Sequence, residues 1–314
     1  MKPAATRWHT DAVLQAKLSE EVTAALSDGV AVVALESTIF SNLGLPSPAN
    51  ADALARCTGA IRSRGAVPAV TAVLDGDARV GLDEHEHEHE RILGPARKAA
   101  ERDLAVAVAQ RWEFGATTVS ASLALAASAG IEVFATGGIG GVHRGAELTG
   151  DVSADLDALA HHPVIAVCAG AKAFLDLART LEYLETVGVP VLGWRHDWFP
   201  AFYTRSSGLR APHRVESADE VVATLRHRTR PSTGVLVGVP IPESDELDPD
   251  QLDAVLSRAL EDCERAGIVG AAVTPFVLGR IAEATEGRSI PANLALAEHN
   301  AAVAAEIAVA LAGG

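Results

Sequence analysis

Lysine is scarce in this 314-residue chain: only four lysines stand among its 26 lysine and arginine residues. One of them, Lys172, follows the apolar run Val164–Cys168 after a short Ala-Gly-Ala turn. Such a run is typical of a buried parallel strand, and open α/β sheets bind ligands beyond the carboxyl ends of their strands. Desolvation there would favour the neutral, nucleophilic form of an amine, which Schiff-base chemistry on a carbonyl requires. A solvated lysine at the start of a helix explains the position equally well.

Glu36 occupies the corresponding place after an earlier apolar run, Val30–Leu35. Partial burial raises the pKa of a carboxyl group toward neutrality, so a glutamate directly after a buried strand is a candidate general acid. A group that caps the following segment is the alternative.

A glycine-rich segment, Thr136–Gly145, follows a third apolar run and could aim backbone N–H groups at an anion. It matches neither the dinucleotide-binding nor the Walker pattern, so a tight turn stays the alternative. The acidic segment Gly150–Asp155 comes soon afterwards and could supply oxygen ligands to a hard divalent cation. Helix capping explains Asp151 or Ser153 equally well.

A run of alternating histidine and glutamate, Glu84–Glu90, invites a metal-binding interpretation. Residues two apart on a helix point around it rather than to one side, and neighbouring glutamates suit a solvated face. We therefore expect this run to lie on the surface without a metal.

The elements that must position these residues are short, fully apolar strands that alternate with helical patterns. Strands are expected at 30–35, 67–74, 131–135, 164–168, 189–192 and 234–239. Helices are expected at 10–27, 50–64, 118–129, 173–185 and 249–266, with further ones after residue 217 and from residue 291. This alternation predicts an α/β fold with a mostly parallel central sheet covered on both faces, in a single domain over residues 1–314.

Composition narrows the class of protein further. The formal net charge of −15 argues against broad contact with nucleic acid. Three widely spaced cysteines suggest neither a disulfide framework nor a thiolate zinc site, so a reducing cytoplasm is expected. No apolar run approaches the roughly 20 residues that span a bilayer, which predicts a soluble protein without a membrane partner.

Five segments together resemble the pseudouridine-5′-phosphate glycosidase family, also called indigoidine synthase A-like. They are Ala34–Ile39, Thr136–Gly145, Asp151–Leu156, Val167–Lys172 and Phe202–Gly208. The similarity runs from about residue 20 to the C-terminus and includes Thr274-Pro275-Phe276. It implies a three-layer α/β/α domain, a homotrimer, a divalent metal usually taken as manganese, and reversible cleavage of the carbon–carbon bond between ribose 5-phosphate and a base.

The resemblance also implies roles for individual residues. Lys172 looks like the Schiff-base lysine, Glu36 the proton donor, and Asp155 an acid–base residue that opens the ribose ring. Asp151 looks like the metal-binding aspartate. The substrate-binding positions would be Lys98, Val119, Thr136, His143, Ser153, Ala154 and Asn293. The chemistry is consistent with these roles. A C-glycosidic bond has no basic leaving-group heteroatom, so ordinary glycosidase chemistry is poor. An iminium at the anomeric carbon would supply the missing electron sink.

Several positions depart from the family pattern. The usual Ser-His-Gly-Met-Pro is replaced by Ser41–Pro46, which loses the histidine and gains a residue, and Trp198 stands where glutamate is usual. A further stretch, Lys98–Leu104, and His299 also differ from the usual residues. If Trp198 and the Ser41–Pro46 loop line the base site, it should discriminate against uracil; the alternative is that Trp198 packs under its loop.

These departures keep other functions open. The main alternative is a C-glycoside synthase that joins ribose 5-phosphate to a non-uracil nucleophile in C-nucleoside biosynthesis. A non-catalytic sugar-phosphate-binding protein is less compatible with a lysine, a glutamate and an aspartate retained together. An aldolase-like lyase would share the Schiff-base lysine but would not require the whole collinear pattern.

Overall fold

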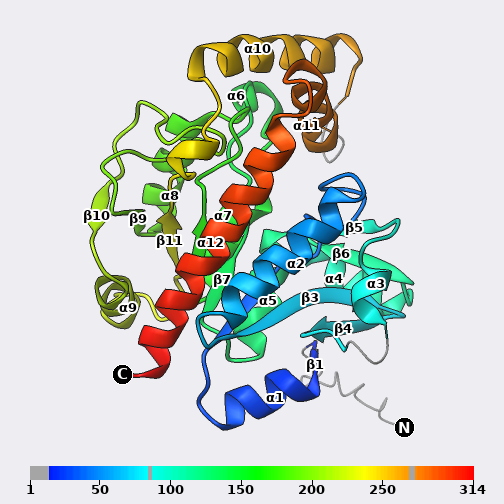
Figure 1. Ribbon diagram of the computed structural model, residues 1–314, viewed down its shortest axis with the longest axis vertical. Helices are drawn as coiled ribbons and strands as arrows, with labels where there is room; N and C mark the ends of the chain where they lie inside the picture. Colours follow the sequence, from blue (N-terminus) through cyan, green and yellow to red (C-terminus); the bar gives the residue numbers. More distant parts are fainter. Residues whose placement is uncertain (1–13, 84–86, 269–272) are drawn as a thin grey trace, which may run out of the picture.

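The structure is a computed structural model that describes residues 14–83, 87–268 and 273–314 (Figure 1). Its centre is a sheet whose strands run in the order β1-β4-β3-β2-β7-β8-β11-β9-β10, with β6 pairing with β3 and β5 pairing with β6. The strands are β1 Lys17–Leu18, β2 Val32–Leu35, β3 Val67–Leu74, β4 Asp77–Val80, β5 Arg97–Ala99, β6 Phe114–Thr117, β7 Val133–Ala135, β8 Ile165–Cys168, β9 Val191–Trp194, β10 His213–Val215 and β11 Val235–Gly238.

Helices cover both faces of this sheet. They are α1 Glu20–Ser27, α2 Ala49–Arg62, α3 Glu88–Arg91, α4 Glu101–Ala109, α5 Val119–Ser128, α6 Ala146–Thr149, α7 Ala154–His161, α8 Leu177–Val187, α9 Ala218–Arg226, α10 Pro249–Arg265, α11 Val273–Ala284 and α12 Ser289–Ala312, with a 3₁₀ turn at Glu243–Asp245. In Figure 1, α2 and α12 lie side by side in front of the sheet, with α5 and α7 behind it.

The central strands β2, β7, β8, β11 and β9 are parallel to their neighbours and buried along their whole length. Burial on both faces is why their sequences are continuous apolar runs rather than alternating patterns. The predicted α/β fold with a mostly parallel sheet between helical layers is confirmed.

The sheet has one antiparallel corner that we did not predict. β3 pairs in antiparallel fashion with β4 and with β6. The β3–β4 hairpin turns at Asp75-Gly76, where both residues have positive φ values of 52° and 82°. An Asp-Gly pair between two strands is a strong hairpin signal, because its two residues adopt the left-handed backbone that a tight turn requires.

The expected helix at 10–27 is wrong in its first half. Lys17–Leu18 instead form β1, which pairs with β4, and α1 begins only at Glu20. Ser19 sets this start, because its side chain accepts a hydrogen bond from the backbone N–H of Val22 at 3.3 Å. Residues 10–13 lie outside the described part of the chain.

Helix α12 corrects the expectation that no apolar run could span a bilayer. It has 24 residues, and its mean hydropathy of 1.4 makes it long and apolar enough by composition. However, 61% of its apolar window is buried inside the protein, where it packs on α2, β7 and β8. The core helix of a globular fold meets the same length and composition criteria.

The histidine–glutamate run is only partly described, since residues 84–86 lie outside the structure's described ranges. Contrary to the expectation of a solvated face, Glu88 is 1% exposed. One of its carboxylate oxygens lies 2.9 Å from an Arg79 guanidinium nitrogen, and the other accepts the Asp83 N–H at 2.8 Å. Burial of this carboxylate is tolerated because it is paired with a cation and hydrogen-bonded.

Candidate active site

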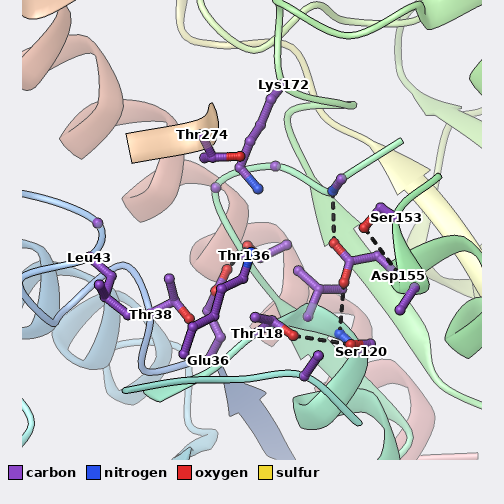
Figure 2. A pocket seen from close by; sticks show the side chains of 18 of the residues that line it. Glu36, Thr38, Leu43, Thr118, Ser120, Thr136, Ser153, Asp155, Lys172 and Thr274 are labelled. Carbon is purple, nitrogen blue, oxygen red and sulfur yellow. Dashed lines mark hydrogen bonds between the residues drawn. The ribbon is translucent and has the colours of Figure 1, made fainter. Parts of the chain in front are cut away.

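Three neighbouring parallel strands end at the same edge of the sheet, and each is followed by a predicted site residue. Glu36 follows β2, Thr136 follows β7, and Lys172 lies four residues beyond the end of β8. A cavity of about 590 Å³ opens at this edge (Figure 2). All eleven predicted site residues line it: Glu36, Lys98, Val119, Thr136, His143, Asp151, Ser153, Ala154, Asp155, Lys172 and Asn293.

Glu36 is 8% exposed, and its carboxylate accepts a hydrogen bond from the Thr136 hydroxyl. Burial raises the pKa of Glu36, because it disfavours the charged form. The positive charge of Lys172 and the Thr136 hydrogen bond oppose this effect without cancelling it. A glutamate with a raised pKa keeps its proton at a higher pH, as a proton donor must.

Asp155 is 6% exposed and is held by two backbone N–H groups from distant segments. Its Oδ1 accepts from Ser120 N at 3.0 Å, and its Oδ2 accepts from Gly140 N at 2.8 Å. Gly140 lies so close that a Cβ atom there would collide with the Ser153 hydroxyl. The glycine-rich segment therefore serves the aspartate through its backbone, and its lack of a side chain makes the approach possible.

Lys172 and Lys98 bring two positive charges to the cavity. Lys172 is half-buried, and its backbone N–H donates to Ile139 O at 3.1 Å, which ties its loop to the glycine-rich segment. Its side chain points into the cavity in Figure 2. Lys98, from β5, is more exposed. Its pKa is lowered mainly by desolvation and, to a smaller extent, by the positive charge of Lys172. The charge of Lys172 therefore disfavours the charged form of the Lys98 amine.

His143 and Asp151 form a loose pair at the cavity, with 3.8 Å between His143 Nδ1 and Asp151 Oδ2. Desolvation lowers the pKa of His143, although the Asp151 charge opposes it, so the neutral imidazole is favoured.

The donor set here limits what metal could bind. In the part of the chain that the structure covers, no cluster of three or more histidine, cysteine, aspartate or glutamate side chains could hold a metal ion. A single half-exposed carboxylate such as Asp151 fits a hydrated hard cation, which keeps most of its water ligands. It does not fit a tightly caged zinc ion.

Sequence reasoning missed several cavity residues. Ser120 contributes through its backbone N–H, which no side-chain pattern can reveal. Thr38 and Leu278 also line the cavity, and Leu278 comes from α11, far away in sequence. Thr38 carried a signal, since it follows Glu36 by two residues.

The departures from the family pattern divide into two groups. Leu43 and Ala100 line the cavity. Asn42 instead accepts a hydrogen bond from Ala96 N at 2.9 Å, on the neighbouring loop. Trp198 is absent from the described cavity lining; it is 36% exposed, and the Arg210 guanidinium lies 5.0 Å from the centre of its ring. The expectation that Trp198 lines the base site therefore finds no support in this cavity.

Fold and cavity together define an α/β protein with a small-molecule site at the carboxyl edge of a parallel sheet, equipped with two lysines and two buried carboxylates. The family model for "Indigoidine synthase A like protein" matches residues 21–310. The chain belongs to this family.

Curated relatives carry a more specific name. A pseudouridine-5′-phosphate glycosidase from Methylobacterium nodulans is 50% identical over 298 residues, covering 93% of this chain and 87% of the relative. One from Caldanaerobacter subterraneus subsp. tengcongensis is also 50% identical, covering 94% of this chain and 96% of the relative.

Solved structures agree with the fold. The prealnumycin C-glycosynthase AlnA, in complex with ribulose 5-phosphate, superposes with a TM-score of 0.86 at 35% identity, covering 96% of this chain and 98% of AlnA. An indigoidine synthase A-like protein from Thermotoga maritima gives a TM-score of 0.83 at 35% identity, covering 95% and 97% of the two chains.

Proposed function

We propose that this protein reversibly cleaves and forms the carbon–carbon bond between ribose 5-phosphate and a base, through a Schiff base on Lys172. In the cleavage direction, pseudouridine 5′-phosphate and water give uracil and ribose 5-phosphate. The observation that carries the proposal is the convergence of Lys172, Glu36 and Asp155 on one cavity. The names of the relatives and the sugar phosphate bound to AlnA support the same substrate class.

The proposed steps are simplest in the direction of synthesis. Asp155 takes the proton of the C1 hydroxyl and delivers it to the ring oxygen as the bond between C1 and the ring oxygen breaks, which gives the open-chain aldehyde. The neutral Lys172 amine adds to the aldehyde carbon, water leaves, and an iminium forms. A carbon of the base attacks the iminium carbon, and the proton that this base carbon loses passes to Glu36. The C4 hydroxyl oxygen then attacks the same carbon, the bond from that carbon to the lysine nitrogen breaks, and the hydroxyl proton passes to the departing amine. Cleavage is the reverse, with Glu36 returning the proton to the departing base.

The remaining binding roles follow the family resemblance. Lys98, Thr136, His143 and Asn293 would hold the sugar phosphate, together with the Val119 and Ser153-Ala154 segments. Asp151 would hold a divalent ion, manganese in our proposal, which would supply charge neutralisation for the phosphorylated sugar. We also propose, on the resemblance alone, a homotrimer and a cytoplasmic location.

A first experiment tests the covalent step. The protein is incubated with ribose 5-phosphate and sodium borohydride, digested, and examined by mass spectrometry. We expect reductive labelling at Lys172, since its amine forms the imine. Labelling at Lys98 alone, or none in a sample that turns over substrate, would contradict the assignment.

A second experiment identifies the base. The protein is incubated with ribose 5-phosphate and either uracil or one of a panel of other carbon nucleophiles, and the products are separated and identified by mass spectrometry. We expect pseudouridine 5′-phosphate from uracil. Product from another nucleophile but not from uracil would favour the C-glycoside synthase, a candidate that Leu43 at the cavity wall keeps open.

A further inference from the structure

Beneath the cavity lies a cluster of four fully buried hydroxyl side chains, Ser37, Thr71, Thr117 and Ser122. They come from the segment after β2, from β3, from β6 and from α5. None of the four is among the described residues that line the cavity, so they do not touch a bound substrate there. We call this set the hydroxyl cluster.

The hydrogen bonds of the hydroxyl cluster run in one direction, because each hydroxyl group has a single proton. Ser122 donates to Thr118 O at 2.8 Å, so it must accept from the Thr71 hydroxyl, also at 2.8 Å. Because the Thr71 hydroxyl proton is already donated, the Thr117 hydroxyl must be the donor between these two residues. It lies 2.7 Å from the Thr71 carbonyl oxygen and 2.8 Å from the Thr71 hydroxyl oxygen. Ser37 then donates to Thr117 at 3.1 Å and accepts from Thr117 N at 3.0 Å.

Thr117 is therefore the central member of the cluster. Removal of its hydroxyl would leave the Ser37 proton without its acceptor and Thr71 without its donor, in a fully buried place. The carbonyl oxygen of Thr117 is also engaged, since it accepts from the Thr38 hydroxyl at 2.7 Å and from Thr38 N at 3.2 Å.

The cluster joins the segment that carries Glu36 to the segment that donates a backbone hydrogen bond to Asp155. On one side, Ser37 and Thr38 directly follow Glu36. On the other side, Thr117 leads through Thr118 into the first turn of α5, where Ser120 N donates to Asp155 at 3.0 Å. Thr117 therefore links the Glu36 segment to one of the two backbone donors that hold Asp155; the other donor, Gly140 N, comes from the glycine-rich segment.

We propose that Thr117 is a positioning residue, whose hydroxyl aligns Glu36 and Asp155 without touching the substrate. This inference rests on the proposed function, because it assigns a purpose to the spacing of the two carboxylates. A misplacement of a catalytic group by about 1 Å lowers the rate by up to about 100-fold, so we expect loss of the Thr117 hydroxyl to lower kcat.

The test compares Thr117→Val, which keeps the shape and removes the hydroxyl, with Thr117→Ser, which keeps the hydroxyl. Thr233→Val is the matched control, because Thr233 is also a buried threonine whose hydroxyl bonds a carbonyl oxygen, that of Ala160, away from the cavity lining. Turnover of pseudouridine 5′-phosphate gives kcat and KM. The rate of borohydride trapping with ribose 5-phosphate gives a readout that needs no base, and the trapped fraction counts competent sites.

Per competent site, we expect Thr117→Val to lose about 10- to 100-fold in kcat with KM changed less than about threefold. Thr117→Ser should return to within about threefold of the wild type, and Thr233→Val should stay within about twofold. An unchanged kcat for Thr117→Val, or an equal loss in Thr233→Val, would overturn the positioning role. If Thr117→Val does not fold, Ser37→Ala replaces it with the same criteria.

Failure of the proposed function would be visible separately. A wild type that neither turns over pseudouridine 5′-phosphate nor forms a trapped imine would refute that function, and the positioning role with it. A wild type that forms the imine but rejects the uracil nucleotide would refute only the choice of base. In that case the trapping rates of the same variants decide the positioning role.

Discussion

Glu36→Gln separates proton donation from imine formation. The substitution is nearly isosteric, and the amide oxygen can still accept the Thr136 hydrogen bond. General acid catalysis contributes about 100- to 10,000-fold, which corresponds to about 3–5 kcal/mol of barrier. We expect turnover of pseudouridine 5′-phosphate to fall by this factor. Reductive trapping of ribose 5-phosphate on Lys172 should stay within about threefold, because Lys172 and Asp155 are untouched.

The same variant should gain stability, and the gain should depend on pH. The pKa of Glu36 is raised above 4.5 because its burial outweighs the attraction of Lys172. The folded protein therefore binds this proton more tightly than the unfolded chain does. In the wild type, the stabilisation that protonated Glu36 contributes is complete below about pH 4.5 and is lost as pH rises through the raised pKa. Glutamine is neutral throughout, so the difference in Tm between variant and wild type should be larger at pH 8 than at pH 5.

Turnover and thermal denaturation at the two pH values measure both effects on one pair of samples. Aspartate at the same position, Glu36→Asp, is the control that keeps a carboxyl group but shortens its reach. Full turnover by Glu36→Gln would refute the role of proton donor. A Tm advantage that is larger at pH 5 would refute the argument from burial.

Three further predictions concern the metal, the base site and the core. Chelation should stop turnover and manganese should restore it, and Asp151→Asn should raise the manganese concentration needed for half-activation by about tenfold or more; full activity of a demonstrably metal-free sample would contradict the metal role. Leu43→His should raise kcat/KM for pseudouridine 5′-phosphate about fivefold, the equivalent of one net hydrogen bond of about 1 kcal/mol, and an unchanged value would show that Leu43 does not face the base. Phe134→Ala, in fully buried β7, should lower the free energy of unfolding by about 3–5 kcal/mol in urea denaturation, and a loss below about 1 kcal/mol would show that the site collapses around the missing ring.

The central strands were predictable because burial on both faces leaves a continuous apolar run, as in β2 and β8. Short peripheral strands were not, since β5 has three residues, two of them exposed, and β1 has two. The site residues could be placed because the carboxyl ends of parallel strands share one edge of the sheet. The backbone donors to Asp155 could not, because they depend on how the start of α7 meets the start of α5 and the glycine-rich segment in space. The single domain over residues 1–314 stays a prediction.

Under the proposed function, the sugar chemistry and the choice of base rest on different parts of the cavity wall. Lys172 and Glu36 follow β8 and β2, and Asp155 lies at the start of α7. Figure 2 shows Leu43 on the same side as Glu36, away from Asp155. Leu43 belongs to an irregular loop, which can change sequence and length without moving a strand. A change of this loop can therefore alter which base is accepted while the lysine chemistry stays intact, so one scaffold can serve both a glycosidase and a C-glycoside synthase.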